Sequence, residues 1–135
     1  MPTHLFLVVL HVDDAQIDET VRFLSEVVGM GEPRWFDAPG ANAHRLFPQW
    51  PADVDSRRVV LGEGAGTIEL IAVPAELRGA IPVGPAVLSF ATPDVDGHIE
   101  RAAAAGYAVG DVIDVNGTRL GPVQVGGLPW QFTRF

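Results

Sequence analysis

The sequence predicts an α+β fold made of two βαβββ modules, whose curled mixed sheets surround a cavity with the helices outside. Three observations lead to this prediction. The chain has 135 residues, the length of one domain with a sizeable core. Short apolar runs typical of strands alternate with two stretches at helical spacing. The order strand, helix and three strands occurs twice, with a proline-rich segment between the copies.

The first module is expected over residues 1–74. It opens with an apolar strand over 3–11, followed by a helix over 15–28 whose apolar positions recur at helical spacing and which Asp13–Asp14 precedes as a cap. Gly29, Gly31 and Pro33 end this helix. Strands are then expected at 34–37, 57–61 and 67–73, while 42–50 is either another strand or an irregular loop.

A linker over residues 75–85 contains two prolines and separates this module from the second, over 86–135. Asp94 is the expected N-cap of the second helix. The expected elements are a strand over 86–92, a helix over 95–105, a strand over 107–115, a turn at Asn116–Gly117, a strand over 118–125, a turn at Gly126–Gly127 and a strand over 130–135.

Composition excludes several classes of function. The net charge is −8 and all nine basic residues are arginine, which argues against nucleic acid or anionic membrane surfaces as partners. The absence of lysine excludes Schiff-base chemistry, and the absence of cysteine excludes disulfides, thiolate catalysis and cysteine-ligated zinc. No apolar run approaches the roughly 20 residues of a membrane helix. We expect a cytoplasmic protein without a membrane partner.

Glu69 is the most informative charged residue, because it lies inside the apolar strand predicted over 67–73. A carboxylate there costs free energy unless it is solvated, paired or bound to a metal. Two interpretations follow: Glu69 faces a cavity that holds a ligand, or it is a solvated or arginine-paired group on an open sheet face. The expected ligand site is the concavity between the two half-sheets.

Aromatic residues supply further candidates. Alternation places Trp130 and Phe132 on the strand face opposite Gln131, so those two rings are expected in the core against a helix. Other candidates come from the segment 35–50, which is expected to line or cover the cavity. Its predicted ligand-binding residues are Trp35, His44, Phe47 and Trp50.

The two half-repeats carry a resemblance to a known family. One reads Val9 to Asp14 followed by Val21 to Met30, and the other reads Leu88 to Asp96 followed by Ala105 to Tyr107. These segments resemble the vicinal oxygen chelate superfamily, which includes glyoxalase I, bleomycin-resistance proteins, extradiol dioxygenases and methylmalonyl-CoA epimerase. The resemblance covers nearly the whole chain. It implies the fold more specifically than the function, because this fold hosts several chemistries.

The resemblance also implies where a metal would bind. Metal-using members take His, Glu, His and Glu from the first and last strands of each module. The matching positions here are His4 or Phe6, then Glu69, Val87 and Gln131. A Zn, Ni, Mn or Fe ion would therefore have His4, Glu69 and Gln131 as ligands. Because Val87 cannot bind a metal, no cofactor is favoured.

The leading functional hypothesis is a homodimeric small-molecule-binding protein of the bleomycin-resistance type, which sequesters an antibiotic or metabolite. Glu69 and Gln131 would contact an aromatic or cationic ligand. Two alternatives stay open: a divalent-metal-dependent lyase, isomerase or epimerase, and a metal-free enzyme in which Glu69 is the base. The sequence does not decide whether the protein is an enzyme, or whether the two modules meet within one chain or across a swapped dimer.

Overall fold

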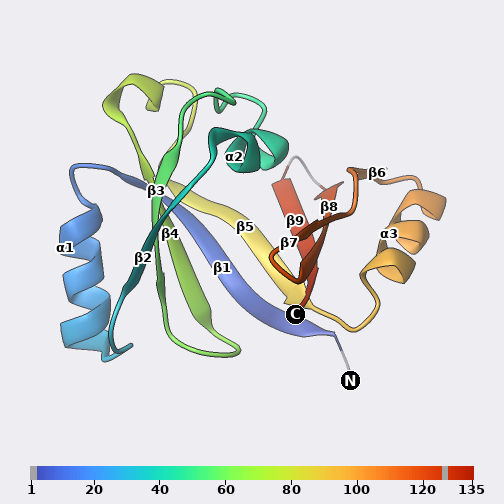
Figure 1. Cartoon of the computed structure of the whole chain (residues 1–135), viewed down its shortest axis with the longest axis horizontal. Helices are drawn as coiled ribbons and strands as arrows, with labels where there is room; N and C mark the ends of the chain where they lie inside the picture. Colours follow the sequence, from blue (N-terminus) through green and yellow to red (C-terminus); the bar gives the residue numbers. More distant parts are fainter. Residues whose placement is uncertain (1–2, 126–127) are drawn as a thin grey trace.

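The computed structural model describes residues 3–125 and 128–135. The predicted α+β fold class is correct. In the described part of the chain, nine strands form one curled sheet in the order β2-β3-β4-β1-β5-β9-β8-β6, with β7 paired to β8 (Figure 1). Helices α1 and α3 lie at opposite sides of the molecule, and α2 lies between the two half-sheets (Figure 1).

The helices and strands occur in the predicted order, apart from the additional helix α2 and the division of one predicted strand into β6 and β7. The first half contains β1 (His4–Asp13), α1 (Ile17–Arg22), a π-helix (Phe23–Val28), β2 (Arg34–Ala38), α2 (Gly40–Leu46), β3 (Ser56–Leu61), β4 (Thr67–Val73) and a 3-10 turn (Ala75–Leu77). The second contains β5 (Gly84–Ala91), α3 (Val95–Ala104), β6 (Ala108–Val109), β7 (Ile113–Val115), β8 (Thr118–Val125) and β9 (Leu128–Arg134).

The two halves join through their first strands. β1 runs antiparallel to β5, and each of these strands also pairs in parallel with the last strand of its own half, β4 or β9. In this structure the two halves therefore pair within one chain. A register shift between Leu5 and Leu7 interrupts the β1–β5 ladder at Phe6. This irregularity matters for the site because it breaks the strict alternation of side chains along β1.

Alternation along β4 divides its side chains between two environments. Ile68, Leu70 and Ala72 pack with Ile17 and Val21 of α1 in one apolar cluster. Thr67, Glu69 and Ile71 face the opposite side and line a hollow. The helix side of the sheet thus supplies core packing, while the concave side is where polar groups gather.

The second half repeats this division. On β9, Trp130 and Phe132 lie near Phe90, with ring centroids 6.2 Å apart in both pairs. Gln131 lies on the other face and lines the hollow, as the sequence predicted. α3 packs closely over this half: a Cβ atom added at Gly121 would lie 2.7 Å from Ile99 and 2.8 Å from Val95. Asp94 caps α3 as predicted, accepting a bond from the Gly97 amide at 3.0 Å.

The predicted helix over 15–28 is only partly correct. It begins as α1 at Ile17 and continues as a π-helix from Phe23 to Val28. The wider π-helical turn shifts the inward face, and no residue of the π-helix is buried: Val28, at its end, is 54% exposed. Asp13 accepts a bond from the Ala15 amide at 2.9 Å, but it does not cap the helix, whose first residue comes later.

The segment 42–50, predicted as a strand or an irregular loop, is irregular only from Phe47 onward. Residues Gly40–Leu46 form helix α2. Ala43, Phe47 and Trp50 are spaced at helical intervals and pack together in the core beneath α2. The helix can approach the following loop because Gly40 has no side chain: a Cβ atom there would lie 2.6 Å from the Val54 carbonyl oxygen.

The strand predicted over 107–115 is divided into β6 and β7. Gly110 separates them, and its amide bonds the Pro122 carbonyl oxygen at 3.0 Å. The predicted turn at Asn116–Gly117 is confirmed by positive φ angles of 49° and 83°. The turn predicted at Gly126–Gly127 lies outside the described residues.

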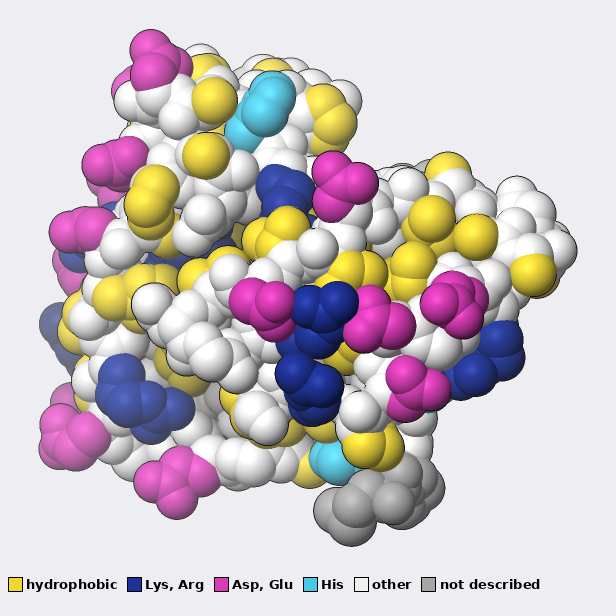
Figure 2. Space-filling model, turned by 45° about the vertical axis from the view of Figure 1, so that its right-hand side comes forward, with side chains coloured by type: hydrophobic (Ala, Val, Ile, Leu, Met, Phe, Trp, Pro, Cys, Tyr) yellow, Lys and Arg dark blue, Asp and Glu magenta, His cyan; other side chains and the backbone are white. Residues whose placement is uncertain are grey.

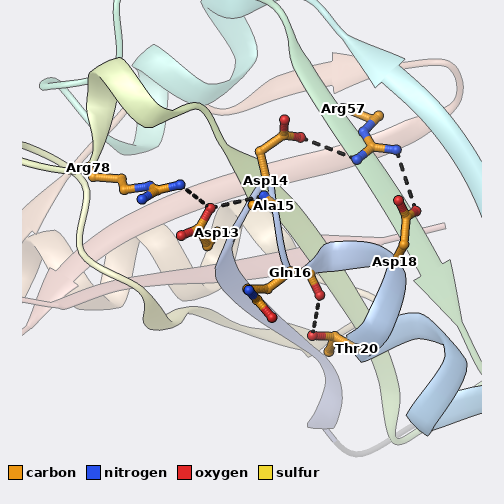
Figure 3. Close-up of polar contacts among 8 residues, drawn as sticks. All are labelled: Asp13, Asp14, Ala15, Gln16, Asp18, Thr20, Arg57 and Arg78. Carbon is orange, nitrogen blue, oxygen red and sulfur yellow. Dashed lines mark hydrogen bonds and ion pairs between the residues drawn. The ribbon is translucent and has the colours of Figure 1, made fainter.

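An ionic network fixes the chain where β1 ends and α1 begins (Figure 3). Arg78 contacts Asp13 at 2.6 Å, and Arg57 contacts Asp14 at 3.2 Å and Asp18 at 3.7 Å. These groups are largely solvent-exposed, so each pair contributes little to stability. The network joins β1, β3 and the segment after β4 on the outer side of the sheet. No helix among the described residues is long and apolar enough to cross a membrane.

Candidate ligand cavity

A cavity of about 350 Å³ occupies the concave side of the sheet, next to α2. Strands from both halves contribute to it, and α2 supplies the side chains that cover one part. Most of its lining is apolar: Phe6, Leu7, Val9, Leu46, Phe47, Val60, Ile71, Val87, Ile113, Val115, Leu120 and Phe135. Its polar lining consists of Arg34, Asn42, Arg45, Arg58, Thr67, Glu69, Ser89, Thr118, Gln131 and Thr133.

Glu69 and Arg58 form one charged pair in this cavity. They are diagonal neighbours in the β3–β4 ladder, where Arg58 lies opposite Ile71 and Glu69 opposite Val60, and Arg58 Nη1 is 3.7 Å from Glu69 Oε2. Their side chains are only 11% and 13% exposed. Burial raises the pKa of Glu69 above its usual value, and the positive charge of Arg58 partly opposes that shift. Arg58 Nε also donates to Ser56 Oγ at 2.8 Å.

Arg45 and Gln131 form a second polar pair, on the other side of the cavity. Arg45 extends from α2, and its Nη2 donates to Gln131 Oε1 on β9 at 3.1 Å. Its Nε and Nη1 atoms are buried without a hydrogen-bond partner among residues 3–125 and 128–135. Burial lowers the pKa of Arg45, and the nearby charge of Arg58 lowers it further. The two guanidinium groups therefore share one environment.

The charged side chains of the cavity are three arginines and one glutamate. The third arginine, Arg34, donates from Nη2 to the Gly62 carbonyl oxygen at 2.7 Å. This positive excess contrasts with the chain's net charge of −8, and with the many acidic side chains on the face shown in Figure 2. The expectation of a cationic ligand rested on Glu69 and on the acidic character of the chain. The arginines give the cavity a positive excess, which does not favour a cation.

The structure brings three of the predicted ligand-binding residues together. Phe47, Glu69 and Gln131 all line the cavity. Two strands, β1 and β5, lie between the strands of Glu69 and Gln131, and the curl of the sheet turns both side chains toward the same space.

Trp35, His44 and Trp50 do not line the cavity, which corrects their predicted placement. Trp35 is 40% exposed and lies under the Arg57 guanidinium, 5.0 Å from the ring centroid. Trp50 is fully buried and donates from Nε1 to the Val54 carbonyl oxygen at 2.7 Å. His44 is exposed, and its Nδ1 lies 2.7 Å from the Trp50 carbonyl oxygen. Helix α2 accounts for the exposure of His44 and the burial of Trp50, while its residues Asn42, Arg45 and Leu46 line the cavity.

The sequence reasoning missed the arginines. Nine arginines were candidates to pair with Glu69, but none was assigned. Alternation along β3 places Arg58 and Val60 on the face opposite the buried Val59, so the strand period was a usable signal for Arg58. No comparable signal existed for Arg45, because its position depends on a helix that the sequence did not predict.

His11, near the end of β1, is buried and only 4% exposed. Its ring lies 4.4 Å from that of Phe47 and 6.2 Å from that of Trp50. Its Nε2 has no hydrogen-bond partner in the described part of the chain. Burial, with a smaller contribution from Arg58, lowers the pKa of His11 from 6.5 to about 4. The imidazole is therefore neutral at physiological pH and acts as part of the core.

Comparison with solved structures identifies the fold. A variant of Streptomyces coelicolor methylmalonyl-CoA epimerase, in complex with 2-nitronate-propionyl-CoA, superposes with a TM-score of 0.68 at 15% identity, covering 99% of this chain and 95% of that one. A glyoxalase/bleomycin resistance protein/dioxygenase superfamily member from Vibrio splendidus gives 0.58 at 14% identity, covering 99% and 100%. The chain has the vicinal oxygen chelate fold.

A third structure, the methylmalonyl-CoA epimerase of Mycobacterium tuberculosis, gives a TM-score of 0.65 at 16% identity, covering 96% of this chain and 86% of that one. No family model matches the sequence, and no curated protein matches it. Identities this low establish the vicinal oxygen chelate fold and leave the function to be argued from the residues of the site.

The metal site implied by the resemblance to the vicinal oxygen chelate superfamily does not fit the residues present. His4 does not line the cavity of Glu69 and Gln131; it lines an adjacent surface hollow, which shares Thr133 and Phe135 with that cavity. The residues of β1 that line the cavity are Phe6, Leu7 and Val9. Among the described residues, no group of three His, Cys, Asp or Glu side chains could hold a metal ion.

The remaining donors are equally unsuited to a metal. The two central strands present Leu7, Val9, Val87 and Ser89 to the cavity. Glu69 already has Arg58 as its counter-charge, and Gln131 accepts from Arg45. A divalent ion needs several anionic or imidazole donors at one point, and three arginines in the same cavity repel it.

Proposed function

We propose that this protein binds a small organic molecule in the cavity between its two half-sheets. The observation that supports this best is the cavity's composition: apolar walls with a few polar groups converging from β3, β4, β9 and α2. Ligand pockets have this character, whereas well-packed interiors contain few voids larger than a water molecule. Binding and retention of a metabolite or antibiotic follow from this arrangement without any catalytic step. The homodimer stays a prediction.

A fluorescence titration tests the proposal. N-phenyl-1-naphthylamine is uncharged and fluoresces strongly in apolar surroundings, so it reports on the cavity without depending on charge. We expect saturable binding at one site per chain. The Leu120→Trp variant should abolish it by filling the cavity, while Val83→Trp, at a position 61% exposed and outside the cavity, should bind as the original does. Equal binding by both variants, or no binding, would contradict the proposal.

A second candidate function is metal-free proton transfer by Glu69. It is favoured by one observation: Glu69 faces the cavity, and burial raises its pKa toward the range useful for a general base. Such a base takes a proton from the carbon next to a carbonyl group, and a proton from solvent then replaces it on that carbon. The test is exchange of the methylene protons of phenylpyruvate in deuterated water, followed by NMR. An exchange rate above the buffer rate, lost in Glu69→Gln, supports it; a buffer-level rate excludes this activity toward this compound.

A further inference from the structure

We infer that the ligand of this cavity is an organic acid, and that Arg45 is the residue that binds its oxyanion. The inference rests on the proposed function, since it concerns the same cavity. It adds the chemical class of the ligand, which neither the fold nor the structural neighbours supply.

The first argument concerns the hydrogen-bond donors of Arg45 and their partners. A guanidinium carries five N–H donors and no acceptor. The described residues account for one partner, Gln131 Oε1 at 3.1 Å, while Nε and Nη1 are buried and unpaired. A buried unpaired donor destabilises the folded state, and more so when it belongs to a charged group. A ligand oxyanion against Nε or Nη1 would remove that cost.

The second argument is the distribution of charge. Arg58 has a counter-charge, Glu69, at 3.7 Å. Arg45 forms no ion pair with any residue in 3–125 or 128–135, although it lies close enough to Arg58 for that charge to lower its pKa. Two neighbouring guanidinium groups and one carboxylate, which is paired with Arg58, leave a positive charge in a low-dielectric space. A second carboxylate, supplied by the ligand, would balance it.

The third argument is that Arg45 is held in place. Gln131 fixes its Nη2, so the guanidinium plane is oriented before a ligand arrives. The loss of side-chain entropy of Arg45 when a ligand binds is therefore small. The apolar side chains around it, such as Leu7, Val87 and Leu120, suit a hydrocarbon or aromatic body attached to the acid group. An inorganic anion would use the guanidinium without gaining from these walls.

Competition against N-phenyl-1-naphthylamine tests the inference with two matched compounds. 2-Naphthoate and 2-naphthamide share an aromatic body and differ in charge. We expect 2-naphthoate to displace the probe at a concentration at least ten-fold below that of 2-naphthamide, because hydrogen bonds to charged groups contribute about 1.5–3 kcal/mol. Arg45→Met should reduce this ratio to about one while keeping the probe bound. Arg101→Met, on the exposed surface of α3, is the matched control and should keep the ratio.

The outcomes separate the two proposals. Equal displacement by acid and amide from the original protein overturns the inference but leaves the cavity as a ligand site. An unchanged preference in Arg45→Met also overturns it. Failure of the probe to bind removes the proposed function, and 2-naphthoate is then titrated directly by calorimetry, where the absence of a heat of binding overturns the inference too. If Arg45→Met does not fold, as judged by near-ultraviolet circular dichroism, the comparison of acid and amide on the original protein still decides.

Discussion

Arg58 Nη1 lies 3.7 Å from Glu69 Oε2 on the adjacent strand, and both side chains are almost completely buried. Desolvation acts on the two groups in opposite directions, raising the pKa of Glu69 and lowering that of Arg58, and each charge opposes the shift of the other. Each charge therefore offsets part of the cost of burying the other in an apolar environment. Because Glu69, the one carboxylate side chain among the described residues that line the cavity, is paired with Arg58, Arg45 has no counter-charge there and can bind the acid group of a ligand.

Removing Arg58 should destabilise the protein more than removing the pair. Arg58→Met leaves Glu69 buried without its counter-charge, at an expected cost of about 3 kcal/mol in the free energy of unfolding. Arg58→Met combined with Glu69→Gln should recover most of that loss. Urea unfolding of the four proteins of this double-mutant cycle measures it. A double variant less stable than Arg58→Met would show that the pair is not the reason for the loss.

His11 should make stability depend on pH. Its pKa is about 4 in the folded state and 6.5 in the unfolded chain, so unfolding takes up a proton between these values. The stability it contributes is complete above pH 6.5 and is lost as pH falls toward 4, by about 3 kcal/mol. His11→Phe should flatten the stability curve in this range.

Glu69 acts in the opposite sense over part of that range. Its pKa is raised on folding, so its contribution is largest at low pH and is lost as pH rises through the folded value. The pH series should therefore compare His11→Phe with the original protein, and each again in the Glu69→Gln background. An equally steep curve in His11→Phe and the original protein, in both backgrounds, would contradict the account of His11.

The close approach of α3 to β8 should depend on Gly121. Gly121→Ala adds a methyl group 2.7 Å from Ile99 and 2.8 Å from Val95, which the packed interface must accommodate at a cost of about 1–3 kcal/mol. Gly79→Ala is the control, because nothing lies within 4 Å of the added carbon. Thermal unfolding should separate the two variants; equal melting temperatures would show that α3 can shift away freely.

Divalent metals should leave the protein unchanged. The cavity presents one carboxylate already paired with Arg58, and His4 lies elsewhere. We therefore expect neither Zn²⁺ nor Ni²⁺ to raise the melting temperature, and a chelator not to lower it, since a bound ion stabilises the folded state by mass action. A stabilisation by metal that disappears in Glu69→Gln would mean that the site rearranges to bind it.

Substitutions of Trp35 and Trp50 should leave binding of the probe unchanged, and only the substitution of Trp50 should lower stability. Trp50→Phe removes a buried hydrogen bond and core volume, and should cost about 1–3 kcal/mol without weakening N-phenyl-1-naphthylamine binding. Trp35→Ala should change neither property by much, because the ring lies outside the cavity. Weakened binding of the probe in Trp35→Ala would restore Trp35 as a ligand contact.

The sequence predicted the strands well because their signals are local. β2, β3, β4 and the turn at Asn116–Gly117 follow from alternation and from glycine punctuation, and the duplicated order of elements was enough for the fold class. α2 was missed because His44, Arg45 and the prolines after Phe47 conceal a short helical pattern. The helical spacing of Ala43, Phe47 and Trp50 was present in the sequence, but tertiary burial decides between helix and loop in so short a segment.

The site was predicted in part for the same reason. Glu69 and Gln131 follow from the period of two strands, and both line the cavity. His4 was assigned from the resemblance, but the residues of β1 that line the cavity are Phe6, Leu7 and Val9. The ladder irregularity at Phe6, which sequence alone does not reveal, brings Phe6 and Leu7 to the same side. The positive charge of the cavity was not predicted, because Arg45 comes from α2 and Arg58 from β3, two elements that meet only in the folded chain.

A crystal structure of the protein grown with 2-naphthoate tests the central claim most directly. The account predicts the naphthalene rings in the cavity against Leu7, Val87 and Leu120, with a carboxylate oxygen at hydrogen-bond distance from Arg45 Nε or Nη1, and the Arg58–Glu69 pair retained. A cavity closed by rearranged side chains, or a ligand whose carboxylate faces away from Arg45, would contradict it.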